Sequence, residues 1–182
     1  METQTTNATT WVIDPTHSEV QFKVKHLMVS TVTGAFNTYE GQLTMVNDDF
    51  EDAEITFSAD IDSITTGSEQ RDGHLKSADF FDAEHFPQLT FKSTGMKKAT
   101  DDFYYLTGDL TMHGITKPVS LKAEYGGQMQ DFYGQTKAGF ELTGTIKRKE
   151  FGLTWDGITE AGGVVVSDDV RLVLNIQVTK QA

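Results

Sequence analysis

The sequence contains no cysteine and only three prolines among its 182 residues. Without cysteine there can be no disulfide bond, no thiolate nucleophile and no metal site built on thiolates. No apolar run approaches the ~20 residues of a membrane-spanning helix. Residues 1–10 are polar and lack the positive start and apolar core of a secretory signal. We therefore expect a cytoplasmic protein as given, and a periplasmic or extracellular one if a signal has been removed.

Basic residues are also scarce. There are 15 Lys and Arg against 27 Asp and Glu, which gives a net charge of -12. This charge opposes nucleic acid and anionic membrane surfaces, and the densest basic run, Lys147–Lys149, ends in Glu150. We expect no nucleic-acid partner and no stable membrane insertion. With 37% hydrophobic and 23% charged residues, the composition indicates one folded domain over residues 11–182 after a disordered polar tail, residues 1–10.

Alternating apolar and polar residues dominate the chain. Between Ser18 and His26 the side chains alternate almost without fault, which indicates a strand with one buried and one wet face. Similar alternation recurs to the end of the chain. It predicts an all-β fold of about eight strands, arranged either as a sandwich or as a single antiparallel barrel whose interior holds side chains or one ligand.

A few segments depart from this alternation. The stretch Gly34–Val46 changes phase near Gly41, which suggests a bulge, and residues 47–49 suggest a turn. His113-Gly114 is a tight-hairpin signal. Residues 67–77 have the only helical pattern, so we expect one short helix there.

Seven short sequence motifs, taken in their order along the chain, resemble those of a known family. They are Asp14–Leu27 (DPTHSEVQFKVKHL), Arg71–Ser77 (RDGHLKS), Phe80-Phe81 with Phe86-Pro87, Thr90–Thr94 (TFKST), Gly108–Thr111 (GDLT), Gly114–Val119 (GITKPV) and Arg148–Gly152 (RKEFG). Together they resemble the YceI-like polyisoprenoid-binding family over roughly Trp11 to Val178, although Lys147 and Glu150 depart from its more usual Asn and Asp. The resemblance implies a lipocalin-like barrel with an apolar tunnel that holds an isoprenoid or another long-chain amphiphile.

Strand parity turns a set of mostly apolar residues toward the barrel interior. The candidate ligand-binding residues are Val20, Phe22, Val24, His26, Phe36, Phe57, Ala59, Phe91, Leu110, Met112, Leu121, Ala123, Phe140, Leu142 and Leu174. Small residues among the inward positions, including Gly108 and Gly144, are expected to leave volume unfilled. The pattern alone favours the alternative, in which large and small residues interdigitate into a solid core.

Two polar residues are candidates for contact with a ligand head group. His26 lies inward at a strand end, and Arg71 carries a guanidinium group suited to phosphate. The alternative for His26 is a buried imidazole bonded to a carbonyl. The sequence Arg71-Asp72-Gly73-His74 also permits an ion pair and a helix cap, and a structural role is the favoured interpretation. The five histidines lack metal-binding spacing, so we expect no metal and no cofactor beyond a bound lipid.

The resulting hypothesis is a non-catalytic carrier that sequesters or transports a polyisoprenoid, such as a quinone tail or prenyl lipid. The first alternative is an enzyme acting on an isoprenoid lipid, which would need inward acid and base groups where the sequence offers clearly only His26. The second is a stress-related interaction domain with a filled barrel. A homodimer is also possible, because Val173 is expected to lie exposed on the outer face of the last strand.

Overall fold

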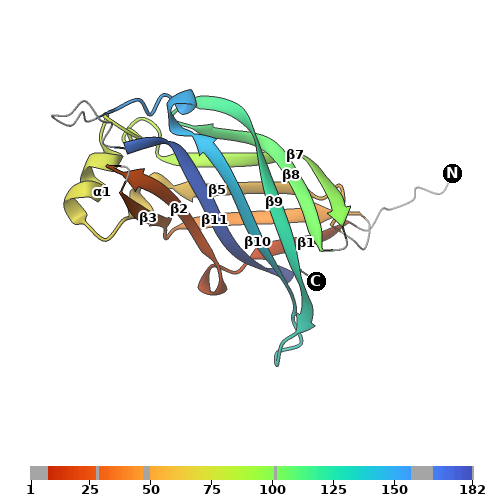
Figure 1. The fold of residues 1–182 in the computed structure, drawn as a ribbon. Coiled ribbons are helices and arrows are strands. Elements are labelled where there is room, and N and C mark those ends of the chain that lie inside the picture. Colours follow the sequence, from red (N-terminus) through yellow and green to blue (C-terminus); the bar gives the residue numbers. More distant parts are fainter. Residues whose placement is uncertain (1–7, 28, 47–49, 101, 157–165, 182) are drawn as a thin grey trace.

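The computed structural model describes residues 8–27, 29–46, 50–100, 102–156 and 166–181. These residues form one antiparallel sheet and one α-helix (Figure 1). The strands are β1 (Thr9–Ile13), β2 (Glu19–His26), β3 (Ser30–Phe36), β4 (Tyr39–Met45), β5 (Glu54–Asp60), β6 (Ile64–Thr65), β7 (Gln88–Thr100), β8 (Phe103–Met112), β9 (Ile115–Gln130), β10 (Thr136–Lys147) and β11 (Val166–Lys180). The helix is α1 (Glu69–Lys76), and short 3-10 helices are η1 (Pro15–His17), η2 (Ile61–Ser63) and η3 (Arg148–Phe151).

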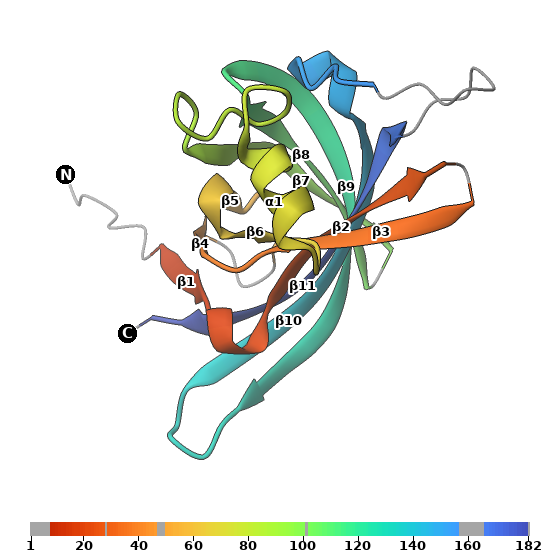
Figure 2. The same ribbon diagram turned by 90° about the vertical axis from the view of Figure 1, so that its left-hand side faces the viewer.

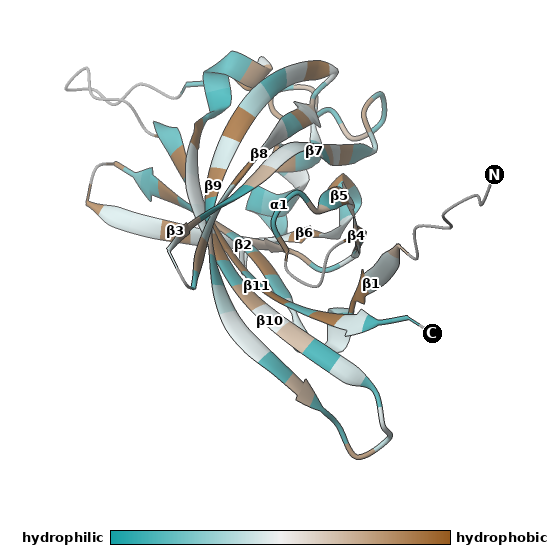
Figure 3. Cartoon of the chain, turned by 90° about the vertical axis from the view of Figure 1, so that its right-hand side faces the viewer, coloured by the Kyte–Doolittle hydropathy of each residue, from teal (hydrophilic) through white to brown (hydrophobic). Residues whose placement is uncertain are grey.

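Eight of these strands close into a ring. The order β1-β4-β5-β7-β8-β9-β10-β11 returns to its start because β1 also pairs with β11, at Trp11 opposite Lys180 and Ile13 opposite Val178. The other half of β11 pairs with β2, which continues through β3 to β6. Bands of opposite hydropathy alternate along β9 and β10 (Figure 3), as a strand with one buried face requires. The predicted antiparallel barrel of about eight strands is confirmed.

The predicted bulge near Gly41 is wrong. The chain leaves β3 at Phe36 and enters β4 at Tyr39, and the two strands have different partners. β3 pairs with β2, whereas β4 pairs with β1 and β5. The apparent change of phase is therefore a boundary between two strands. A turn of two residues between them left no proline or glycine signal in the sequence.

Other local predictions have direct counterparts. α1 lies within the predicted helical region 67–77, and the side chain of Ser68 caps it by accepting a hydrogen bond from the Arg71 N–H. His113 and Gly114 both have positive φ angles, 55° and 74°, and join β8 to β9 as a tight hairpin. Thr9 and Thr10, assigned to the tail by composition, instead pair with Met45 and Thr44. Residues 1–7 and the turn predicted at 47–49 lie outside the described residues.

At several glycines in the barrel wall, a neighbouring side chain occupies the space that a β-carbon would fill. A β-carbon at Gly34 would overlap the ring of Phe22, and one at Gly108 would overlap the ring of Phe91. A β-carbon at Gly144 would similarly overlap Leu121. The expectation that Gly108 and Gly144 leave volume unfilled is therefore wrong. These glycines let bulky side chains lie flat against the wall.

Candidate ligand cavity

The barrel encloses a cavity of about 390 Å³. This volume falls within the range of about 300–1,000 Å³ that is usual for small-molecule sites. On β11 the lining positions run from Val166 to Val178, and the part with unbroken alternation, from Val170 to Val178, corresponds to roughly 25 Å of strand. The cavity is therefore elongated along the barrel.

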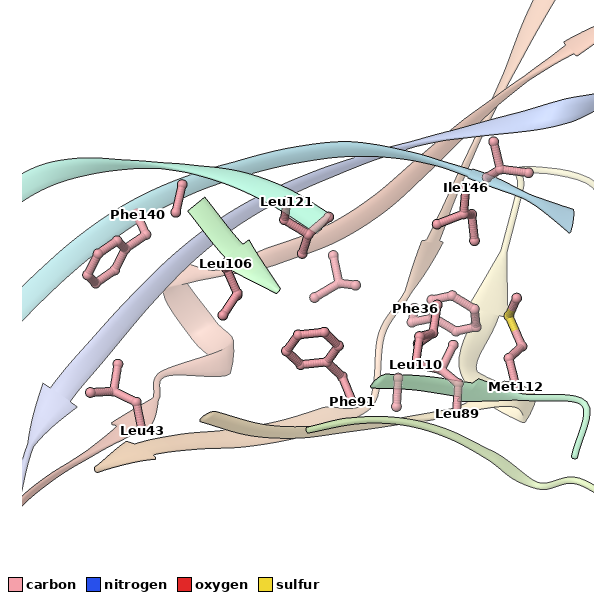
Figure 4. Close-up of a cluster of buried hydrophobic side chains, with 14 of the residues drawn as sticks. Phe36, Leu43, Leu89, Phe91, Leu106, Leu110, Met112, Leu121, Phe140 and Ile146 are labelled. Carbon is pink, nitrogen blue, oxygen red and sulfur yellow. The ribbon is translucent and has the colours of Figure 1, made fainter. Parts of the chain in front are cut away.

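Aliphatic and aromatic side chains form most of the wall. In Figure 4, side chains from opposite walls point toward one another, among them Phe91, Leu121 and Phe140. Apolar residues line the cavity along several strands, namely Ile13, Val32, Leu43, Ile55, Leu89, Met96, Leu106, Ile146, Leu172 and Ile176. A wall of this kind offers few hydrogen-bond partners to water, so the cavity favours an apolar occupant.

Nearly all of the residues that parity turned inward line this cavity. They are Val20, Phe22, Val24, His26, Phe36, Phe57, Phe91, Leu110, Met112, Leu121, Ala123, Phe140, Leu142 and Leu174. Ala59 does not line it. Ala59 is 1% exposed and pairs with Tyr39 and Leu89, so it packs within the wall at the end of β5. Whether any of these residues touches a ligand stays a prediction.

One end of the barrel lies beside α1 (Figure 2). An aromatic cluster forms here. The His74 ring makes edge contacts with Phe80 and Trp155, at centroid distances of 5.1 and 4.8 Å, and its Nε2 lies 2.9 Å from the Asp79 carboxylate. All three rings line the cavity. Strand periodicity could not identify them, because they come from a helix and two loops.

Arg148 is the most heavily hydrogen-bonded cation at this end. Its side chain is buried, and all three guanidinium nitrogens donate hydrogen bonds. The acceptors are the carbonyls of Leu153, Trp155, Val166 and Ser167 and the carboxylate of Asp156. Hydrogen bonds from Lys149 and Arg148 hold the pKa of the Asp156 carboxyl below its ordinary value. Arg148 therefore fixes the backbone that carries Trp155, and its donors are used within the protein.

Arg71 is anchored differently. Its Nε donates to the Thr66 hydroxyl at 2.7 Å, and its Nη2 donates to the Thr66 carbonyl at 2.6 Å. Thr66 is itself held by Asp72, which accepts hydrogen bonds from the Thr66 N–H and hydroxyl. Arg71 and Asp72 are thus linked through Thr66 and form no direct ion pair, although the spacing permitted one. Arg71 is exposed and lines the cavity together with Thr66.

His26 also lies at this end. It is half-buried, lines the cavity, and pairs with Ser30 of β3 and Val166 of β11. Leu27 and Val29 follow it and are 42% and 85% exposed. Val32, which pairs with Val24 on the neighbouring strand, lines the cavity wall.

Three further observations bear on the sequence predictions. Among the described residues, no group of three or more His, Asp or Glu side chains is arranged to hold a metal ion. No helix among them is long and apolar enough to cross a membrane. Val173 is half-buried on β11, so it is less exposed than the sequence predicted.

Comparisons with known proteins agree with this architecture. A UPF0312 protein of Pectobacterium atrosepticum is 38% identical over 165 residues, which cover 91% of this chain and 82% of that protein. The crystal structure of a Campylobacter jejuni YceI protein matches with a TM-score of 0.74 at 31% identity, covering 87% of this chain and 90% of the other. A polyisoprenoid-binding domain from Saccharophagus degradans has a TM-score of 0.66 at 16% identity, covering 92% and 97%.

At 16% identity, the similarity to the Saccharophagus degradans domain concerns the fold alone. The family model described as the YceI-like domain matches residues 11–178, which includes every strand of the closed ring in whole or in large part. The chain belongs to the YceI-like domain family.

Proposed function

We propose that the protein binds a long-chain amphiphilic lipid, of the polyisoprenoid class, with its chain inside the barrel and its polar head at the α1 end. The observation that carries the proposal is the elongated apolar cavity of about 390 Å³. Water filling such a volume, on the order of a dozen molecules, would find few polar partners. A flexible apolar chain gives up no hydrogen bonds when it leaves water, and it gains van der Waals contacts along the whole wall.

The fold family supports the same class of ligand. One structural neighbour is described as a polyisoprenoid-binding domain. At ~0.3 kcal/mol per heavy atom, roughly 30 buried chain atoms would supply about 9 kcal/mol, which corresponds to submicromolar binding. Dispersion and burial are non-directional, so the wall would select chain length and bulk more than chemical detail.

A carrier role is favoured over the two alternatives. An enzyme needs acid and base groups beside the bound chain, but the two histidines that line the cavity lie at its polar end. His74 is engaged there by Asp79 and two aromatic rings. A filled interaction barrel would have no cavity of this size. We therefore propose sequestration or transport without catalysis.

A pair of adjacent residues on β11 provides the test. Leu174 lines the cavity, whereas Val173 does not and lies on the opposite face of the same strand. Leu174→Trp should plug the cavity and weaken binding of a fluorescent long-chain probe by about tenfold or more. Val173→Trp should bind the probe as the wild type does. Equal affinity of both variants and the wild type would mean that the probe does not occupy the barrel.

A further inference from the structure

The barrel is closed by aromatic side chains at the end that lies away from α1. β5 begins at this end and runs to Asp60, after which the chain continues through η2 and β6 into α1. Four rings pack together here, and the centroids of contacting rings are 4.9–5.6 Å apart. They belong to Trp11, Phe50, Tyr125 and Phe140. Of the four, Phe140 alone lines the cavity, so the cavity ends before the other three.

Phe50 differs from the other three because it does not belong to a strand of the wall. It lies between β4 and β5, yet its ring contacts Tyr125 on β9 and Phe140 on β10. In the closed ring, two strands separate β5 from β9 on one side, and two separate β4 from β10 on the other. The side chain of Phe50 therefore crosses the interior of the barrel. It is 2% exposed, so other side chains surround it there.

The backbone that follows Phe50 is attached to β7. The Asp52 N–H donates a hydrogen bond to the Met96 carbonyl at 2.8 Å, and the Ala53 N–H donates to the Phe50 carbonyl at 3.2 Å. The Lys97 ammonium lies 2.7 Å from the Asp52 carboxylate. Met96 itself lines the cavity. Phe50 is thus held in position by the same strand that forms part of the cavity wall.

We infer that Phe50 determines the longest lipid chain that the barrel accepts, by blocking the interior at the end away from α1. A chain that extends along the cavity toward this end reaches Phe140 and then meets the Phe50 ring. Phe50→Ala removes about six carbon atoms beside Phe140, which is slightly more than the roughly five of one isoprene unit. The variant should therefore accept one additional unit. This inference rests on the proposed function, because it requires a chain in the barrel.

A series of prenyl alcohols that differ by one isoprene unit tests the role of Phe50. Their dissociation constants are measured with the full chain by displacement of one fluorescent probe. In the wild type, affinity should rise with chain length and then level off. In Phe50→Ala it should level off one unit later, and that longer chain should bind about tenfold more tightly than to the wild type, the gain expected from burying about five more heavy atoms. Alcohols too short to reach Phe50 should bind both proteins equally, which also shows that the variant is folded.

The two proposals fail in different ways. If no alcohol of any length binds either protein, both the lipid site and the role of Phe50 are overturned. If affinity levels off at the same length in both proteins, chain binding stands and the role of Phe50 is overturned. Phe50→Leu removes only about three carbon atoms, so it should give a smaller gain for the longer chain. It tests the same claim if Phe50→Ala does not fold.

Phe151→Ala is the matched control. Phe151 is 1% exposed, like Phe50 it does not line the cavity, and it lies in η3 next to the buried Arg148. Its truncation removes the same ring from the core but leaves the end of the barrel at Phe50 closed. The chain length at which affinity levels off should therefore stay as in the wild type. A shift as large as that in Phe50→Ala would contradict the assignment, because any loosening of the core would then produce it.

Discussion

The ring of Phe22 lies against Gly34 of the neighbouring strand, in the space that a β-carbon at residue 34 would occupy. Phe22 also lines the cavity, so this contact sets how far its ring extends into the ligand space. The same arrangement joins Phe91 to Gly108. Glycines in the wall thus determine the width of the cavity through the rings that cover them.

Replacing Gly34 with Ala should therefore narrow the cavity. The three atoms nearest to the added methyl group all belong to the Phe22 ring, which can move into the open interior, so stability should change by no more than about 1 kcal/mol. Long-chain affinity, measured by probe displacement, should fall severalfold. Gly139→Ala is the matched control, because a β-carbon there has no neighbour within 4 Å. An unchanged affinity in Gly34→Ala would show that Phe22 does not limit the ligand space.

Arg148 should be essential to stability. Lysine cannot reproduce five hydrogen bonds from three nitrogens, so Arg148→Lys leaves buried carbonyls without donors and should cost about 2–4 kcal/mol. Urea unfolding measures the loss. Arg171→Lys, at an exposed position on β11, should stay within about 0.5 kcal/mol of the wild type. Coincident unfolding curves for Arg148→Lys and the wild type would refute the role of Arg148 as the anchor of the segment that carries Trp155.

Asp14 should make stability depend on pH. Hydrogen bonds from Thr16, His17 and Lys137 hold the pKa of its carboxyl well below the ordinary value. A depressed pKa means that the native state binds the proton less readily than the unfolded chain, so the carboxylate stabilises the fold above pH ~4 and loses this effect as the pH falls further. Asp14→Asn should be about 1–2 kcal/mol less stable at pH 7, and the difference should shrink below pH 4. A difference independent of pH would exclude this electrostatic origin.

Chain length should control affinity until the cavity is full. Each methylene group that becomes buried contributes at most ~0.8 kcal/mol, so a homologous series of alkyl or prenyl ligands should bind progressively more tightly and then reach a plateau. Competition against one fluorescent probe gives the series under identical conditions. Affinity that does not vary with chain length would mean that the apolar wall makes no contact with the tail.

The barrel was predictable because its strands are long and two-faced. The alternation from Ser18 to His26 correctly turned Val20, Phe22 and Val24 toward the cavity, since side-chain period fixes the face once the strand exists. Where the two strands β3 and β4 follow each other closely, the same rule failed, because alternation does not reveal that the partners change. Ala59 had the right parity but lies at the end of β5, where neighbouring side chains cover it.

The polar end of the site was only partly predictable. His26 could be placed from strand parity and Arg71 from the chemistry of guanidinium, but the role of Thr66 in orienting Arg71 depends on how α1 packs after a loop. Arg148 stood in a basic run typical of a solvated surface; it continues the inward parity of Phe140, Leu142 and Ile146, but that parity does not reveal its hydrogen-bond partners. Its burial arises from contacts with Val166 and Ser167, distant in sequence, which periodicity does not encode.

Native mass spectrometry of the purified full chain tests the central claim most directly. The account predicts a species heavier by one long-chain amphiphile per chain, or the appearance of that species when geranylgeranyl phosphate is added, and its loss in Leu174→Trp but not in Val173→Trp. Organic extraction of the same sample identifies the natural cargo. A protein that carries no amphiphile, gains none on addition of the phosphate, and behaves identically in both variants would contradict the assignment of the barrel as a lipid-binding site.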